Sequence, residues 1–238
     1  MIRERFFFRE TIATILADEP TGVAAAKEGI LGARQALERY IARDPFFRAT
    51  FEPYEPDSDE PVIVRMADAA RKASVGPMAA VAGAIAWAGI DAMVTQGAGF
   101  GVIDNGGDIA LFNPDRPVRV GIHAGAAPIS DRAAFVIPPH ERVHGICTSS
   151  ATVGPSISFG VADAVTVFSD NPALADAWAT TICNRIRADD ASVLRELDRR
   201  QLSGVFAVIG DHTERWGALP PLIRAVVDEQ LISAGDRL

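Results

Sequence analysis

The chain of 238 residues has few of the residues that build disulfide or zinc frameworks. It contains two cysteines and four histidines. Two cysteines in a chain of this length do not form a disulfide framework, and no spacing of cysteine and histidine is typical of a zinc site. The sequence therefore gives no support to a disulfide-stabilised scaffold or a zinc module.

An excess of positive charge is also missing. The chain has 31 acidic and 23 basic residues, with a net charge of −8. An acidic surface repels the phosphates of nucleic acids and the headgroups of anionic membranes. We therefore expect neither nucleic acid nor a membrane surface among the partners.

Long, strongly apolar runs are scarce as well. Three phenylalanines near the N-terminus are flanked by arginines, whereas a signal peptide needs an apolar stretch of about 7–15 residues. Residues 75–93 form the longest apolar stretch, but they are rich in alanine and glycine and include Asp91. A membrane span needs about 20 strongly apolar residues. We therefore expect a buried helix here, and a cytoplasmic protein.

Helical patterns gather in the first half of the chain. Residues 5–16 read as a strand, and a helix follows from Pro20, with Thr21 as its expected N-cap. A second helix is expected to begin near Pro61, after an acidic loop. Pro77 suits the first turn of a third helix, which is apolar all round and is therefore expected to be covered on every side.

Strand patterns dominate the second half. We expect a strand–turn–strand unit over residues 100–112, a helix over 171–187, a short helix over 191–199 and a hairpin over 205–219. Further strands are expected at residues 118–122, 133–137, 143–147 and 164–168. Residues 222–232 are compatible with strand or helix. This order predicts an α+β fold with antiparallel sheets and packed helices, in one domain spanning residues 1–238.

Two glycine-rich segments could approach a ligand. Gly97, Gly99 and Gly101 fail as a dinucleotide-binding loop, because Val102 stands where the third glycine of that motif is required. The turn Asn105-Gly106-Gly107-Asp108 can be a plain hairpin turn, or its glycines can let a ligand approach the backbone. The residues alone leave both readings open.

Oxygen-bearing side chains form two further candidate sites. Asp176 and Thr180 are four residues apart on one predicted helix face, where they can bind Mg²⁺ or serve only the helix. Thr148, Ser149 and Ser150 can bind phosphate or cap turns. Cys147 precedes them. A buried, inert thiol is a simpler interpretation of this cysteine than a nucleophile activated by a nearby histidine.

These segments, in this order, resemble the ApbE family of FAD:protein FMN transferases. The turn at Asn105 resembles the N-x-G-G-D-I motif of that family, and Ala175-Asp176-Ala177-Trp178-Ala179-Thr180 is similar to its A-D-A-x-x-T motif. Cys147-Thr148-Ser149-Ser150 stands where the family has T-S-G, and Val75-Gly76 stands at its A-K-G-x-x-x-D helix start. The resemblance covers residues 74–219.

The resemblance implies an ApbE-like, T-fold-related structure that binds FAD with Mg²⁺. By this resemblance Asp176 and Thr180 are metal ligands, and the backbone carbonyl of Ser74 is a third. The cofactor-binding residues that it implies are Gly76, Asn105, Gly106, Gly107, Asp108, Thr148, Ser149 and Ser150. The implied reaction cleaves the pyrophosphate of FAD and attaches FMN to a threonine or serine of an acceptor protein, with the metal as Lewis acid. It assigns no catalytic side chain.

Departures from the family pattern keep other functions open. Val75 replaces the family lysine, Ala80 stands where its aspartate would be, and residues 154–160 replace its H-x-x-D-P-x-T-G segment. The chain therefore resembles a shortened, divergent branch. A non-catalytic flavin- or nucleotide-binding protein is one alternative, and an enzyme acting on another small, pterin-like ligand is a second. An oligomer is compatible with each reading.

Overall fold

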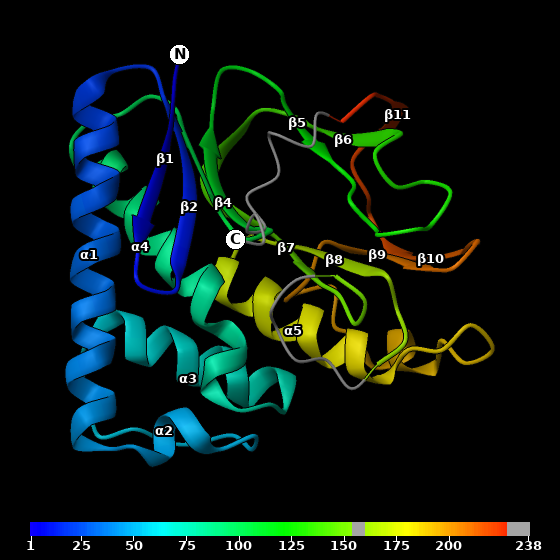
Figure 1. The fold of residues 1–238 in the computed structure, drawn as a ribbon, viewed down its shortest axis with the longest axis horizontal. Coiled ribbons are helices and arrows are strands. Elements are labelled where there is room, and N and C mark those ends of the chain that lie inside the picture. The colour runs from blue at the N-terminus through cyan, green and yellow to red at the C-terminus, as the bar shows by residue number, and fades with distance from the viewer. Residues whose placement is uncertain (154–159, 228–238) are drawn as a thin grey trace.

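The computed structural model of the protein describes residues 1–153 and 160–227 (Figure 1). The α-helices are α1 (Pro20–Arg43), α2 (Phe46–Ala49), α3 (Pro61–Ala73), α4 (Val81–Thr95) and α5 (Pro172–Arg185), with short 3-10 helices at Pro77–Ala80 and Ser192–Glu196. The strands are β1 (Ile2–Phe8), β2 (Thr11–Ala17), β3 (Gly101–Asn105), β4 (Asp108–Asn113), β5 (Val118–Gly121), β6 (Ala133–Ile137), β7 (His140–Ser149), β8 (Ala164–Ser169), β9 (Gly204–Ile209), β10 (His212–Gly217) and β11 (Leu222–Arg224).

The strands form two sheets in which every pairing is antiparallel. The large sheet has the order β1-β2-β3-β4-β7-β8-β9-β10, and the small sheet has the order β11-β6-β5. The helices lie against one face of the large sheet, and the small sheet lies against the other (Figure 1). This architecture confirms the predicted α+β class with antiparallel sheets.

Each face of the large sheet has its own hydrophobic core. Alternate residues of a strand point to opposite faces, so β7 contributes Cys147 to the core under the helices and Ile146 to the core between the two sheets. The core between the sheets is closed by an aromatic cluster, in which Phe135 packs edge-on against Phe168 and Phe206 with ring centroids 5.0 Å and 5.5 Å apart.

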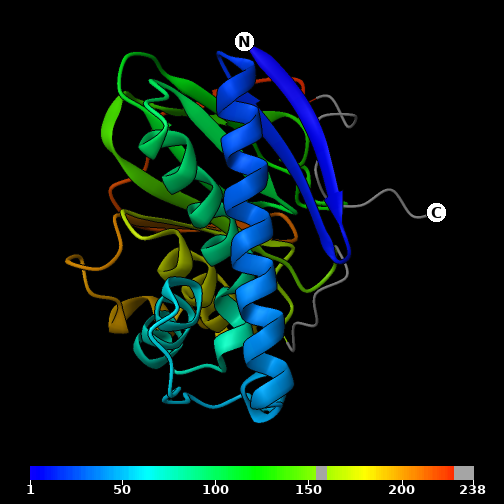
Figure 2. The same ribbon diagram turned by 90° about the vertical axis from the view of Figure 1, so that its left-hand side faces the viewer.

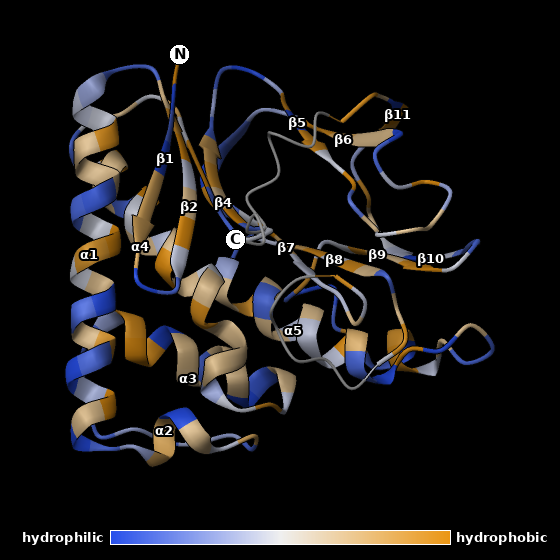
Figure 3. Ribbon diagram, in the orientation of Figure 1, coloured by the Kyte–Doolittle hydropathy of each residue, from blue (hydrophilic) through white to orange (hydrophobic). Residues whose placement is uncertain are grey.

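Helix α1 runs the length of the molecule beside α4 (Figure 2), and polar and apolar residues alternate along it (Figure 3). Glycines let α1 and α4 approach closely. A Cβ at Gly29 would lie 2.5 Å from the carbonyl oxygen of Ala88, so no side chain fits at this crossing. Residues Pro77–Thr95 form the one described stretch that is long and apolar enough to cross a membrane by length and composition, and 44% of it is buried in the fold.

Three local expectations need correction. Residues 5–16 are not one strand, because the chain turns at Arg9, whose φ is +53°, and forms the β1–β2 hairpin. Thr21 lies inside α1, whose N-cap is Glu19. The third helix is only partly covered, since Trp87 and Ala88 are half-buried. Of residues 222–232, only Leu222–Arg224 form a strand within the described part, and residues 228–238 lie outside it.

Candidate functional site

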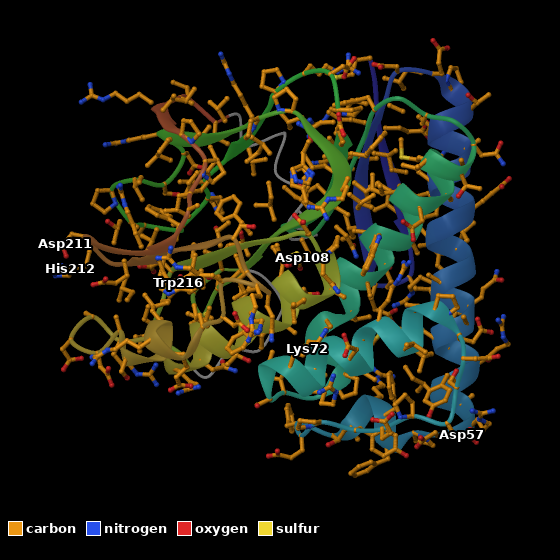
Figure 4. All side chains as sticks on the ribbon, turned by 180° about the vertical axis from the view of Figure 1, so that it is seen from behind. Asp57, Lys72, Asp108, Asp211, His212 and Trp216 are labelled. Atoms are coloured by element: carbon orange, nitrogen blue, oxygen red, sulfur yellow. The ribbon has the colours of Figure 1, made fainter. Side chains whose placement is uncertain are left out.

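The β3–β4 turn provides the first part of the candidate site. Gly106 and Gly107 have φ values of +71° and +101°, which favour glycine, and the Gly107 N–H donates to Asp104 Oδ1 at 2.8 Å. This turn starts β4 at Asp108. Figure 4 shows Asp108 in the middle of the molecule, far from Asp211 and His212 at the exposed end of the β9–β10 hairpin.

The end of strand β7 lies beside this turn. Cys147 pairs with Asp108 in the sheet register, and the Thr148 N–H donates to the Gly107 carbonyl at 3.1 Å. The Thr148 hydroxyl lies 2.9 Å from the hydroxyl of Thr166 on β8. The register of the sheet therefore brings the predicted turn and the predicted hydroxyl cluster together.

Asp176 reaches the same place from helix α5. Its Oδ2 accepts a hydrogen bond from the backbone N–H of Gly83 at 2.8 Å, and the Asn105 side chain donates to the carbonyl of Ala82 at 3.1 Å. Asp176 and Asn105 are thus bound to neighbouring peptide groups in the first turn of α4. Helix α5 itself begins at Pro172, with Asn171 accepting from the Leu174 N–H as a side-chain cap.

Burial disfavours the ionised form of these two carboxyl groups unless a positive charge lies nearby. Asp108 is half-buried as a residue, but its Oδ1 is shielded from solvent, so burial raises its pKa, and the nearby charges of Asp176 and Asp104 raise it further. Burial also raises the pKa of Asp176 to about 7, against hydrogen bonds from Gly83 and Ala82 that lower it. The surroundings of Asp108 therefore favour its protonated form over the bare carboxylate, unless a cation compensates the charge.

The donor set fits a hard divalent cation. Asp108 Oδ1 is buried and has no hydrogen-bond partner among the described residues, and the carboxylate of Asp176 lies close enough to affect its pKa. Carboxylate oxygens are ligands that Mg²⁺ prefers. The Thr148 and Thr166 hydroxyls are not beside this pair, because these residues alternate with Cys147, Val165 and Val167 and so point to the other face of the sheet. The two carboxylates do not amount to a complete cage, and no cluster of three or more acidic, histidine or cysteine side chains with metal-site geometry occurs in residues 1–153 and 160–227. Mg²⁺ would therefore need further ligands from its nucleotide or from water.

Cys147 faces this site but is not activated. Its Sγ lies 3.4 Å from the carbonyl oxygen of Pro172, and burial, together with the charges of Asp108 and Asp176, raises the pKa of its thiol well above the usual value. His144 is three residues earlier on β7, so its side chain points to the other face of the sheet. The geometry agrees with an unreactive thiol.

Other predicted site residues have structural partners of their own. Ser74 ends α3 in the left-handed conformation, with φ of +57°, and the preceding carbonyl of Ala73 accepts from Thr181. A Cβ at Gly76 would collide with the Thr50 carbonyl, so chain packing accounts for that glycine. The Ser150 hydroxyl accepts from the Thr152 and Val153 N–H groups, which is a turn cap.

Two predicted residues stand near the site, and no contact within residues 1–153 and 160–227 ties them to it. Thr180 is half-buried one helical turn after Asp176, and Ser149 is half-buried at the end of β7. Sequence reasoning missed Asp104 and Gly83. The proximity of Asp104 to the turn glycines was a usable signal, whereas nothing local in the sequence marks Gly83 as the partner of Asp176.

Solved structures with the same arrangement define the class. The fold is similar to that of the ApbE protein from Thermotoga maritima, with a TM-score of 0.59 and 11% identity over 90% of this chain and 96% of that one. It is also similar to the flavinyl transferase ApbE from Pseudomonas stutzeri, with a TM-score of 0.54 and 15% identity over 90% and 94% of the two chains. At identities of 11% and 15%, these similarities establish only the fold, which is ApbE-like.

Sequence comparisons then give the family. A family model described as "AbpE bacteria" matches residues 9–202. Proteins named "UPF0280 protein" from Methanoregula boonei and Methanosphaerula palustris are 64% and 58% identical to this chain, over 100% and 99% of both sequences respectively. The chain therefore belongs to the AbpE family, which confirms the resemblance drawn from its motifs.

Proposed function

We propose that the protein binds a flavin nucleotide together with Mg²⁺ and transfers FMN from FAD to a hydroxyl of an acceptor protein. The observation that carries the proposal is the acidic pair, in which Asp176 is buried and Asp108 has a buried Oδ1 without a partner among the described residues. A buried acidic pair of this kind is costly unless a proton or a cation compensates it. The names of the similar structures, which include a flavin transferase from Vibrio cholerae, support a flavin as the ligand.

The residues of the site have separate tasks in this proposal. Asp108 and Asp176 hold the cation, and the Gly83 N–H fixes the orientation of Asp176. The glycine turn offers its backbone to the nucleotide phosphates, because a Cβ at Gly107 would have only the Thr148 carbonyl oxygen within 4 Å, so the space beside it is open. Bound Mg²⁺ supplies charge neutralisation at the pyrophosphate.

The overall reaction balances without another reagent. The acceptor oxygen forms a bond to the phosphorus of FMN, the bond from that phosphorus to the AMP portion breaks, and AMP and a proton leave. The Asp176 and Asp108 carboxylates remain unchanged through the turnover. Their proposed contribution is the position of the charge, not proton transfer.

Thermal unfolding with ligands tests binding. FAD at 100 times its dissociation constant should stabilise the fold by about 2.7 kcal/mol, and Mg²⁺ should increase this effect. An unchanged melting temperature in millimolar FAD and Mg²⁺ would count against a flavin ligand.

Asp176→Asn tests the role of the pair. Asparagine retains an oxygen that can accept from Gly83 but loses the charge, so we expect Mg²⁺ to bind at least tenfold more weakly in calorimetric titrations with FAD present. Asp68→Asn is the matched control, because Asp68 is a partly exposed aspartate on α3 that pairs with Arg71 and Lys72. Equal Mg²⁺ affinities in wild type and Asp176→Asn would leave Asp176 as a cap of α4.

A flavin-binding protein without transferase activity is the second candidate. Ala80, at the position of the family aspartate, is fully buried among apolar residues, and Val75 is half-buried against the same core. These residues offer no polar contact to a nucleotide. Chromatographic measurement of AMP released from FAD separates the two candidates. A binding protein without transferase activity would be stabilised by FAD but would release no AMP.

A further inference from the structure

A cavity lies on the opposite face of the large sheet from the acidic pair. It has a volume of about 310 Å³, and its apolar walls include Phe168 of β8, Pro138 after β6 and Leu219 after β10. Ligand sites in proteins start at about this volume, which suits a single-ring molecule. Its walls come from both sheets, and Phe168 in the wall packs edge-on against Phe135, with ring centroids 5.0 Å apart.

Two histidines form the polar side of this cavity, here called the His144 pocket. The register shift of β4 and β7 between Leu111 and Asn113 brings His140 over His144, with ring centroids 4.7 Å apart. The Asn113 side chain holds the adjoining wall, because its amide donates to the carbonyls of Arg116 and Pro138 at 3.0 Å each. The register shift therefore places both imidazole rings in the wall of the pocket.

The hydrogen bonding of His144 leaves one ring nitrogen for a ligand. Nδ1 lies 3.3 Å from the carbonyl oxygen of Arg142, which can only accept, so the proton of the neutral ring belongs on Nδ1. Nε2 then carries a lone pair, and it has no hydrogen-bond partner among the described residues. Burial supports the neutral form, since it lowers the pKa of His144 to about 4.

The other described residues that line the pocket provide no uncompensated charge. Asp170 at its rim is paired with Arg142, with Oδ2 and Nη2 2.7 Å apart, and it lies 3.7 Å from His140 Nε2. The Ser169 hydroxyl is already used, because it donates to Gln201 and accepts from the Asn171 N–H. A ligand here gains little from carrying a charge.

We propose that the His144 pocket binds a small, uncharged, single-ring compound that donates a hydrogen bond to His144 Nε2 and packs against Phe168 and Leu219. The pocket and the acidic pair lie on opposite faces of the sheet, so this proposal does not depend on flavin transfer.

Titration with 4-fluorophenol, followed by ¹⁹F NMR near neutral pH, tests the proposal. This probe has the ring and the donor, fluorobenzene has the ring alone, and 4-fluorobenzoate replaces the donor with a charge. We expect saturable binding of 4-fluorophenol, weaker binding of both comparators, and a shift of the His144 ring-proton resonance. His144→Phe should weaken 4-fluorophenol about threefold to tenfold, which corresponds to one hydrogen bond, and leave fluorobenzene unaffected.

Blocking and control variants complete the test. Leu219→Trp, or Ser203→Trp at the exposed rim if the first is unstable, should fill the pocket and abolish binding of both neutral probes. His212→Phe should bind like wild type, because His212 is the exposed first residue of β10. Absence of saturation at several millimolar 4-fluorophenol, equal binding by wild type and His144→Phe, or tighter binding of 4-fluorobenzoate would overturn the proposal.

Discussion

Single residues set the balance between stability and ligand binding at the acidic pair. Asp108 is half-buried, its buried Oδ1 has no partner among the described residues, and its pKa is raised in the folded state by burial and by Asp176 and Asp104. A carboxyl group with a raised pKa stabilises the fold fully only below its unfolded pKa, and this stability is lost as the pH rises. Without a cation, the wild type should therefore lose stability as the pH rises from 4 towards 8.

Asp108→Asn should reverse the usual sign of a core substitution. In the presence of a chelator at pH 8, we expect it to raise the free energy of unfolding by about 1–3 kcal/mol, because no buried charge has to be accommodated. The same variant should lose the stabilisation by Mg²⁺. Urea unfolding at pH 5 and pH 8, with and without Mg²⁺, measures both effects, and a variant that is less stable than wild type at pH 8 would contradict the prediction.

His144 should make the fold sensitive to acid. Its pKa is about 4 in the folded protein and about 6.5 in the unfolded chain, so the unfolded state binds more protons between these values. Stability is then lost as the pH falls from about 6.5 to about 4, by up to about 3 kcal/mol. His144→Phe should flatten this part of the profile of unfolding free energy against pH, whereas His212→Phe should leave it unchanged. Equal slopes in wild type and both variants would contradict the assignment to His144.

Residue types alone mark part of the candidate site. Glycines before Asp108 and the spacing of Asp176 and Thr180 identify polar groups that a ligand could use. The sequence does not show that Asp176 meets Gly83 or that Asp104 adds charge to Asp108, because those contacts depend on helix docking and strand register. Ser150 and Gly76 are explained by their own turn and packing, which local sequence cannot distinguish from a ligand role.

At the scale of elements, strong turn signals made the later strands predictable. The unit over β3 and β4 follows from its Asn-Gly-Gly-Asp turn, and β6 and β8 are bounded by changes in polarity. The β1–β2 hairpin was missed because Arg9 and Glu10 are not typical turn residues, and Arg9 adopts a left-handed conformation that side chains rarely favour. Pairing order also escaped prediction, since β4 joins β7 across 26 intervening residues that local pattern does not connect.

The contact between α4 and α5 should tolerate no side chain at Gly83. A Cβ there would lie 2.5 Å from the Pro172 carbonyl oxygen and 2.9 Å from Asp176 Cβ. We expect Gly83→Ala to destabilise the fold by about 1–3 kcal/mol, as overpacking does. Gly32→Ala on the exposed side of α1 has no neighbour within 4 Å, so it should stabilise by about 0.5–1 kcal/mol. Chemical denaturation of both variants measures the two changes in the free energy of unfolding, which should have opposite signs. The higher helix propensity of alanine alone would give both changes the same sign.

For the whole molecule, the two cores share the large sheet. Neighbouring residues of β7 enter different cores, Ile146 between the sheets and Cys147 beneath the helices. The same holds for β9, where Phe206 and Val205 point to opposite sides. Both cores depend on the same strands of the large sheet. Unfolding of one core would expose one face of these strands and weaken the other core, so the two should not unfold independently.

We therefore predict that residues 1–238 unfold as one domain. Differential scanning calorimetry should show one transition, with calorimetric and van't Hoff enthalpies equal within error. A variant on each side of the sheet provides the sharper comparison. Phe135→Leu between the sheets and Met66→Ala beneath the helices, both at fully buried positions, should each move the whole transition to lower temperature. If one variant instead split the endotherm, leaving part of it at the wild-type temperature, the helical layer and the small sheet would be separate cooperative units, and shared strands would be insufficient to couple them.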